Sequence, residues 1–267
     1  MFRIGLGMKI IEHEVLAYII AHAFATTEEI SERFDVATMT VRRCLAKLEE
    51  KNQILRVRSG AVPVSIQTSL SRHLYLNRDE KKKIVAYAVS LCEKANSIFL
   101  DSGSTCYLLA DLIPDEMELT VITHSLDIAA TLRRKNGIRV ITPGGEIDKK
   151  INMMVGTHCE ESLSKFCPDI AFLGAGKVDI SYGTHERELV QIPIKRIMNN
   201  NARTSYLLLD STKFGETSNF RCVPLADIKN IITTDKINPV DLEMFKSKGI
   251  GFIVLDSKNN FSRDSNI

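Results

Sequence analysis

The sequence lacks any apolar run of the roughly 18 residues that a membrane-spanning helix needs. Its first residues lack the long apolar core and the small-residue cleavage site of a secretory signal. The six cysteines include no C-x-x-C pair, and their spacing matches no familiar set of zinc ligands. We therefore expect a cytoplasmic protein with reduced, mostly buried thiols, without a metal and without membrane contact.

Two phosphate-binding motifs are also missing. No G-x-x-x-x-G-K-[ST] or G-x-G-x-x-G segment lies at a strand–helix junction, which argues against a nucleotide-binding module. Internal repeats and low-complexity tracts are absent too. The length of 267 residues suits two globular domains. Met8 offers an alternative start, in which case residues 1–7 would be a disordered extension.

The stretch from Thr26 to Gly60 predicts a helix, a tight turn, a second helix and a short hairpin. Thr26 and Glu29 form a capping box, so the first helix should begin near Thr27. Its buried face would carry Ile30 and Phe34. Residues 35–37 allow a turn of about three residues, the length that a helix-turn-helix uses.

The second helix of this stretch is amphipathic. Val41, Cys44, Leu45 and Leu48 share one face at helical spacing. In a helix-turn-helix the opposite face of the second helix contacts base edges in the major groove, where arginine binds guanine or clamps a phosphate. We therefore predict DNA contacts from Thr38, Met39, Thr40, Arg42, Arg43 and Lys47.

A basic wing is predicted after the second helix. It comprises a strand over Ile54–Arg58, a turn at Ser59-Gly60 and a strand over Ala61–Ile66, and it adds Arg56 and Arg58 to the DNA contacts. Residues 9–35 contain two basic and six acidic residues, whereas residues 37–60 contain six basic and two acidic ones. We predict a DNA-binding domain over residues 9–66. The phosphates of DNA would attract its basic part and repel its acidic part, and this would orient the domain. The alternative is a three-helix bundle with a solvated, charged face.

An α/β domain with a largely parallel sheet is predicted over residues 78–256, after a polar linker at 67–77. Helical and short apolar segments alternate throughout it. Ile84, Ala88 and Leu91 mark one helix, and Asn238-Pro239 begins another. The predicted strands are Ser97–Leu100, Leu119–Ile122, Ile138–Ile141, Ile170–Leu173, Tyr206–Leu209, Ile231–Thr233 and Phe252–Leu255.

Small polar residues follow the carboxyl ends of these strands, which is where such sheets bind ligands. The first strand runs into residues 101–105 and then a helix over Cys106–Leu112, an arrangement that offers N–H groups and hydroxyls to an anion. Other strands end in residues 123–125, 143–146, 174–176 and 210–213. Together these loops suit a small phosphorylated polyol. Taken singly, each is also consistent with a helix cap or a tight turn.

These motifs resemble, in order, those of the DeoR-type transcriptional regulators over roughly Lys9 to Leu255. Residues 36–45, VATMTVRRCL, are similar to the family pattern V-S-x-x-T-I-R-R-D-L, and residues 56–61, RVRSGA, to its wing R-x-x-G-G-A. The other matching segments are residues 101–105, 123–125, 144–145, the region of Gly156, 169–174, 195–198 and 210–215. The sequence departs from the family at Ala37, which weakens the cap of the reading helix or moves it to Thr38, and at Cys44, Ser59, Ser104, His124 and Gln191.

The resemblance implies a winged helix-turn-helix followed by an α/β sensor domain that resembles the ribose-5-phosphate isomerase fold. It implies a repressor of a carbohydrate-metabolism operon that binds double-stranded operator DNA as a homo-oligomer, without a cofactor, and is released by a phosphorylated sugar. The expected effector-binding residues are Asp101, Ser102, Gly103, Ser104, Thr105, Thr123, His124, Gly144, Gly145, Gly174, Lys195, Asp210 and Lys213.

The alternative function is an isomerase-like or deaminase-like enzyme of sugar phosphates with a DNA-binding appendage. Isomerisation needs a carboxylate base placed next to the carbonyl. Gln191 cannot act as that base. The residues that remain possible bases are Asp101, Asp169, Glu186, Glu188 and Asp210. We expect a regulator rather than an enzyme.

Overall fold

A computed structural model provides the structure of the chain. It describes residues 3–256 except for 23, 52, 58, 64–69, 71, 72, 75 and 216, and it also describes 261–263. Of these residues, 3–11, 21 and 261–263 are described by their backbone alone. The chain divides into two compact units, Met1–Leu76 and Asn77–Ile267. Arg58 and the predicted end of the wing at residues 64–66 lie outside the described residues.

The first unit contains the predicted helix-turn-helix, as α2 (Thr27–Phe34) and α3 (Thr38–Glu50). A long helix, α1 (Arg3–His22), precedes them, so the expected disorder of residues 1–7 is wrong from Arg3 onward. Three short strands complete the unit in the sheet order β1-β3-β2: β1 (Ala25–Thr26), β2 (Ile54–Val57) and β3 (Gly60–Pro63). Gly60 pairs with Val57, so it belongs to the strand and not to the predicted turn.

Local interactions explain where α2 and α3 begin. The Thr26 hydroxyl accepts a hydrogen bond from Glu29 N at 3.0 Å, and Thr26 N donates to Glu29 Oε2 at 2.9 Å, which confirms the capping box. No side chain caps α3, because the residue at its N-cap is Ala37. The buried faces meet in a core that contains Val15, Ile19, Ala25, Ile30, Val41, Cys44, Leu45, Leu48, Ile54 and Ala61.

The second unit is built on an eight-stranded sheet, counted over the described residues, in the order β16-β15-β14-β12-β9-β4-β5-β6. Neighbouring strands are parallel except for β15 and β16. Their bounds are β4 (Ser97–Leu100), β5 (Leu119–Ile122), β6 (Ile138–Ile141), β9 (Ile170–Leu173), β12 (Thr204–Leu208), β14 (Asn230–Thr234), β15 (Gly251–Leu255) and β16 (Phe261–Arg263). The strand predicted at Tyr206–Leu209 therefore begins and ends earlier, and β16 lies beyond the predicted domain end at residue 256.

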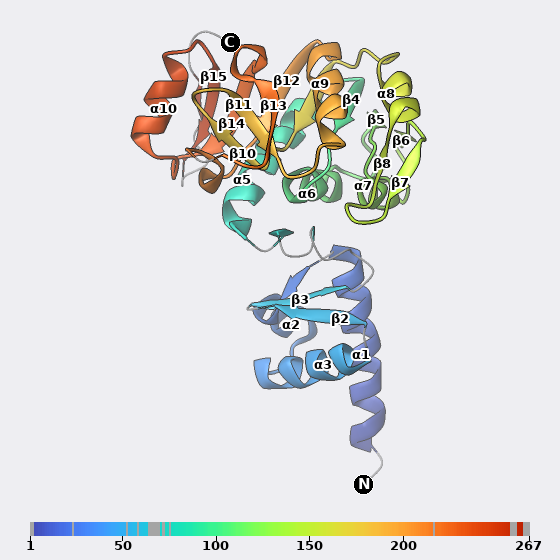
Figure 1. Cartoon of the computed structure of the whole chain (residues 1–267). Helices are drawn as coiled ribbons and strands as arrows, with labels where there is room; N and C mark the ends of the chain where they lie inside the picture. Colours follow the sequence, from blue (N-terminus) through green and yellow to red (C-terminus); the bar gives the residue numbers. More distant parts are fainter. Residues whose placement is uncertain are drawn as a thin grey trace. The chain divides into compact units, whose positions relative to one another are not determined.

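The strand order has one reversal, between β4 and β9. From β4 the chain moves outward through β5 to β6, and from β9 it moves the other way through β12 and β14 to β15. Because such crossovers are right-handed, α6 and α7 cover one face of the sheet and α9 and α10 the other (Figure 1). The helices of this unit are α5 (Arg78–Cys92), α6 (Ser104–Leu112), α7 (Leu126–Leu132), α8 (Thr157–Leu163), α9 (Gln191–Asn201) and α10 (Pro239–Lys246).

Several elements were not predicted from the sequence. A hairpin of β7 (Glu146–Asp148) and β8 (Met153–Val155) follows β6. A small antiparallel sheet has the order β10-β11-β13, with β10 (Lys177–Asp179), β11 (Gly183–Glu186) and β13 (Phe220–Pro224). Two single-turn 3-10 helices lie at Ser211–Lys213 (η1) and Leu225–Asp227 (η2). The helix predicted from Cys106 begins two residues earlier, at Ser104.

Candidate functional sites

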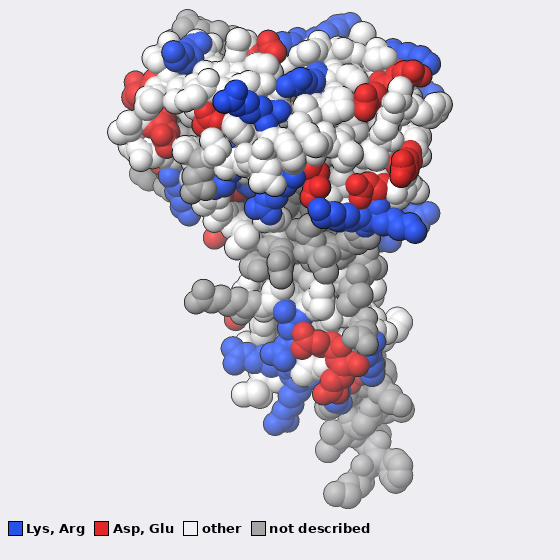
Figure 2. Space-filling model, in the orientation of Figure 1, with Lys and Arg blue, Asp and Glu red and all other residues white. Residues whose placement is uncertain are grey.

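The outer face of α3 presents the predicted DNA contacts to solvent. Arg42 and Arg43 are exposed, whereas Val41 and Leu45 on the opposite face are buried. Neither arginine forms an ion pair with a residue that the structure describes. Figure 2 shows Lys and Arg side chains gathered over this part of the first unit, with acidic side chains between them. The described residues thus leave both guanidinium groups available to a ligand.

Other basic residues near α3 are already paired. Lys47 Nζ lies 3.2 Å from Glu12 Oε1 and Lys51 Nζ lies 2.7 Å from Glu12 Oε2. The bond from Lys51 lowers the pKa of the buried Glu12 carboxyl, and burial opposes this effect. In the wing, Arg56 NH1 lies 3.8 Å from Glu49 Oε2, and Arg56 N donates to Glu49 Oε1 at 2.9 Å. These contacts tie α1 and the wing to α3.

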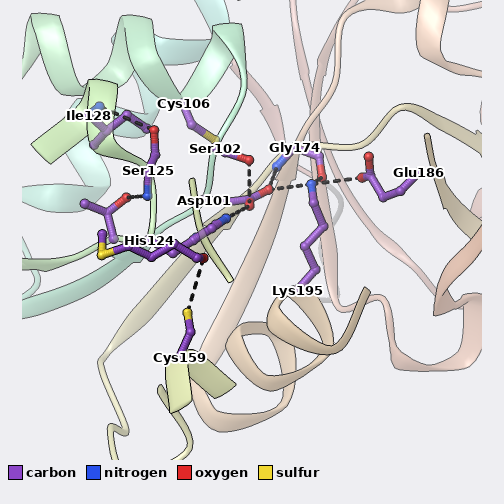
Figure 3. A network of polar contacts seen from close by, with 12 residues as sticks. Asp101, Ser102, Cys106, His124, Ser125, Ile128, Cys159, Gly174, Glu186 and Lys195 are labelled. Carbon is purple, nitrogen blue, oxygen red and sulfur yellow. Dashed lines mark hydrogen bonds and ion pairs between the residues drawn. The ribbon is translucent and has the colours of Figure 1, made fainter. Parts of the chain in front are cut away.

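A buried ionic cluster lies at the reversal between β4 and β9 (Figure 3). Lys195 Nζ, from α9, donates to Asp101 Oδ2 at 2.6 Å and to Gly174 O at 2.8 Å, and it lies 2.9 Å from Glu186 Oε1. Gly174 N donates to the same Asp101 oxygen at 2.9 Å. An ammonium group has three N–H donors, so these three oxygens use all of them.

The charges within this cluster stabilise one another against the cost of burial. Burial opposes the charge on Lys195, but the carboxylates of Asp101 and Glu186 outweigh it and raise the pKa of the amine above its usual value. Burial raises the pKa of Glu186, and the charge on Lys195 opposes that rise. The sequence predicted Asp101 and Lys195 as effector-binding residues, and the structure brings the two together. The sequence offered Glu186 merely as a possible base, because nothing in its local sequence places it beside Lys195.

The loop after β4 opens α6 beside this cluster. Gly103 is the N-cap residue with φ +100, and a Cβ atom there would meet nothing within 4 Å. Ser102 and Thr105 are buried, and Ser104 is partly exposed. The first amides of a helix have no intrahelical partner, and no side chain caps those of α6. This arrangement is suited to an anion.

Thr123 and His124, after β5, are fully buried. The Thr123 hydroxyl accepts a hydrogen bond from Ser125 N at 3.2 Å, and His124 O accepts one from Met154 N at 2.8 Å. Both ring nitrogens of His124 lack a hydrogen-bond partner among the described residues, and Nε2 lies 3.8 Å from Asp101 Oδ1. Burial lowers the pKa of His124 to about 4, although the charge on Asp101 opposes this shift. The ring is therefore neutral near pH 7.

Gly144 and Gly145 lie where β6 leads into the β7–β8 hairpin. A Cβ atom on Gly145 would lie 2.7 Å from Val155 O and 3.0 Å from Cys159 Cβ, and φ there is +109. Glycine is required at this position because the backbones approach closely. A Cβ on Gly144 would come 3.7 Å from the ring of His158, an exposed residue that the sequence did not assign to the site.

Asp210 and Lys213 lie on the loop after β12. Asp210 is buried, and its Oδ1 accepts hydrogen bonds from Asn77 Nδ2 at 2.8 Å, Thr212 N at 3.2 Å and Thr212 Oγ1 at 2.5 Å. Glu80 of α5 accepts from Ser211 N at 2.9 Å and so holds the same loop. Lys213 is half-buried. Burial lowers the pKa of its amine, although the charge on Asp210 opposes this shift.

A separate cavity of about 360 Å³ lies where β10, β11 and the turn between them meet α10, and none of the predicted site residues lines it. Its lining includes Asp179, Tyr182, His185, Arg221, Asp241 and Phe245. His185 Nε2 bonds to Asp179 Oδ2. Within the part of the chain that the structure describes, no group of His, Cys, Asp and Glu is arranged to hold a metal ion. None of the described helices combines the length and apolar character needed to cross a membrane.

The two units define a class of protein. A winged helix-turn-helix that exposes two arginines on its second helix, joined to an α/β unit with a polar cluster at its strand reversal, is a DNA-binding transcriptional regulator with a sensor domain. The chain belongs to the DeoR family. Residues 12–67 match the DeoR-like helix-turn-helix domain, and residues 76–235 match the DeoR C-terminal sensor domain. This assigns it to regulators and not to the alternative class of enzymes.

Bacterial relatives are similar to the chain along most of their length. The HTH-type transcriptional repressor GlcR of Bacillus subtilis is 31% identical over 91% of this chain and 94% of its own. The HTH-type transcriptional regulator IolR of Bacillus subtilis is 29% identical over 84% of this chain and 90% of its own. The glycerol-3-phosphate regulon repressor of Escherichia coli is 27% identical over 85% of this chain and 91% of its own.

Among solved structures, ribose 5-phosphate isomerase A of Methanocaldococcus jannaschii is similar to part of the chain. It is 22% identical with a TM-score of 0.38, and the match covers 52% of this chain and 55% of the isomerase. The fold assignment therefore rests on the elements and the strand order described above.

Proposed function

We propose that this DeoR-family regulator represses a carbohydrate-metabolism operon and that a phosphorylated sugar, bound in the second unit, releases it from its operator. The observation that carries the proposal is the start of α6 at the strand reversal. Open α/β sheets bind ligands beyond the carboxyl ends of their strands at such a reversal. There Gly103 leaves open space in front of the unpaired amides of the helix.

In this proposal the residues of the site have different roles. The phosphate lies on Ser102–Thr105, where N–H groups, hydroxyls and the helix dipole favour an anion. Lys213 supplies a cation to the ligand. Asp101, Lys195 and Asp210 position the loops, because their charged atoms already bond within the chain. The loops that carry Thr123, His124, Gly144, Gly145 and Gly174 enclose the sugar.

On the DNA side, Arg42 and Arg43 would read bases or clamp phosphates, with Thr38, Met39 and Thr40 beside them. Lys47 and Arg56 carry the same charge but are already paired with Glu12 and Glu49. One reading helix supplies limited sequence information, so we propose a homo-oligomer that places two of them on paired half-sites. Light scattering at micromolar concentration tests this, and a monomer with full operator affinity would contradict it.

The site is tested with Gly103→Val in the full chain. This change fills the open space before α6 and imposes strain at a positive φ. The matched control is Gly249→Val, because Gly249 also has a positive φ and open space around it but lies after α10. Operator affinity is measured by fluorescence anisotropy, on a duplex that the wild-type protein selects from random sequence, with and without a panel of sugar phosphates.

We expect both variants to bind the duplex like wild type. Wild type and Gly249→Val should release it when the effective sugar phosphate is added, and Gly103→Val should not. Normal release by Gly103→Val would place the phosphate elsewhere. If no sugar phosphate at millimolar concentration binds the wild-type chain or weakens its operator binding, the proposed effector class is wrong.

A further inference from the structure

Three neighbouring strands, β4, β9 and β12, end at the same edge of the sheet with different chemistry. β9 is the middle strand of the three. On one side of it, β4 leads into the loop at Ser102–Thr105, which is suited to an anion. On the other side, β12 leads into the loop that carries Lys213. Adjacent strands lie roughly 5 Å apart, so the two outer ends are separated by about 10 Å. A single phosphate group is too small to lie on both loops at once.

The middle strand contributes only small residues to the gap between them. β9 ends in Gly174-Ala175-Gly176, which contributes no side chain larger than a methyl group. A Cβ atom on Gly174 would lie 3.4 Å from Ser102 O and 3.8 Å from Asp101 Oδ2. A side chain at Gly174 would therefore stand directly beside the β4 loop. At Gly176 a Cβ atom would lie 2.8 Å from His185 O of β11, so the room between the two loops is limited to the surface at Gly174.

The far loop carries Lys213. No residue that the structure describes gives Lys213 Nζ a hydrogen bond or an ion pair. The nearby carboxylate of Asp210 is bonded to Asn77 and Thr212, and that of Glu186 to Lys195.

A second cation lies alongside. Lys177 Nζ donates to Thr212 O at 2.9 Å, and the bridge between Val178 and Phe214 aligns the two segments. Burial lowers the pKa of Lys213, the charges of Asp210 and Glu186 oppose this shift, and the charges of Lys177 and Arg187 add to it. An anion bound among these three cations would reverse part of this shift.

We propose that the effector is a sugar bisphosphate, with one phosphate on Ser102–Thr105, the sugar across Gly174, and the second phosphate on Lys213 and Lys177. This inference rests on the proposed function and specifies its ligand class. It separates the role of Lys213 from that of the α6 start, because each holds a different phosphate. A pentose or hexose carrying phosphates at its two ends has a length comparable to the separation of the two loops.

The test is calorimetric titration of the full wild-type chain with matched ligands. The probes are fructose 1-phosphate, fructose 6-phosphate and fructose 1,6-bisphosphate, then ribose 5-phosphate and ribulose 1,5-bisphosphate, and finally inorganic phosphate. In at least one series the bisphosphate should bind about tenfold or more tightly than either monophosphate, since one charge-assisted contact is worth that much. Lys213→Gln should remove this advantage, because it should weaken bisphosphate binding about tenfold more than it weakens monophosphate binding. Lys248→Gln, at an exposed lysine after α10, is the control and should change neither.

Each other outcome has a distinct meaning. Monophosphates that bind as tightly as the bisphosphates, with no effect of Lys213→Gln, would overturn this inference and leave the proposed function standing. If no sugar phosphate binds the wild-type chain, both fail together. If Lys213→Gln weakens monophosphates and bisphosphates equally, Lys213 contacts the single phosphate and the second subsite does not exist.

Discussion

The charged residues of helix α3 and those at the strand reversal between β4 and β9 are in opposite environments. On α3, Arg42 and Arg43 point into solvent and no described residue pairs with them. At the reversal, Lys195 and Asp101 are buried and bonded to each other. A charged residue in a motif can therefore act on a ligand directly, or it can hold the chain that does so. Burial and bonding partners tell the two apart.

The largest expected effect comes from removing the buried cation. Lys195→Met leaves Asp101 and Glu186 buried without their partner, and removing one member of such a pair destabilises a protein by about 3–5 kcal/mol. Urea denaturation of the full chain, followed by a probe in the second unit, measures the loss. The control is Lys150→Met, which breaks a 2.7 Å pair with Glu188 at a side chain that is 73% exposed. We expect no measurable change there, and equal stabilities of the two variants would contradict the account.

The second effect is a dependence of the free energy of unfolding on pH, which arises at His124. The pKa of His124 is lowered from 6.5 to about 4 by burial, so the unfolded chain binds a proton more readily than the folded chain. The stabilisation that comes from the neutral ring is complete above pH 6.5 and declines as the pH falls toward 4. Its full size is about 3 kcal/mol. His124→Asn cannot titrate, so its free energy of unfolding should fall less between pH 7 and pH 4 than that of wild type. Parallel curves would show that His124 is accessible to solvent.

The third effect concerns DNA binding and should leave folding untouched. Arg42→Ala or Arg43→Ala should cost about 1–3 kcal/mol in operator binding, since each variant is missing an interaction with a base or a phosphate. An arginine that reads a base will relax specificity at one position when it is removed, whereas one that clamps a phosphate will weaken binding to all sequences alike. Arg133→Ala, at an exposed arginine after α7, is the control. Gel shifts with circular dichroism distinguish the outcomes, and wild-type affinity in both folded variants would overturn the docking assignment.

The smallest effect is at the start of the reading helix. α3 has no side-chain cap because Ala37 occupies the N-cap, with backbone angles of −58 and 141. Ala37→Ser adds a hydroxyl acceptor and should raise the stability of the first unit by about 1 kcal/mol. Thermal unfolding followed in that unit measures the gain. A decrease would mean that the N-cap position is needed for other contacts.

The sequence predicted well those elements that combine a local signal with burial. Four strands, β4, β5, β6 and β9, have the predicted bounds because short runs rich in apolar residues between turns mark parallel strands. The capping box at Thr26 and the proline start of α10 are also local signals, and both are confirmed. The helix-turn-helix could be predicted because its whole pattern lies within one short segment.

The strands and side-chain bonds that the sequence did not predict depend on contacts between distant segments. β10 and β11 contain Lys, Asp, Gly, His and Glu, and they form strands only because they pair with each other and with β13. The partners of Asp101 are likewise remote, because Gly174 and Lys195 are brought to it by the strand order. The sequence therefore indicated that Asp101 follows a strand at this edge of the sheet, whereas its bonds to Gly174 and Lys195 could be found only in the structure.

The proposal that a sugar phosphate releases the protein from DNA is tested most directly by a titration that measures ligand binding and DNA binding together. Labelled operator duplex is bound by the wild-type chain, and anisotropy is followed as a sugar phosphate that raises the melting temperature of the protein is added. A ligand can weaken DNA binding only if it binds the DNA-free state more tightly than the DNA-bound state. We expect release of the duplex over the same concentrations that stabilise the protein. A ligand that saturates the protein while operator affinity stays constant would contradict it.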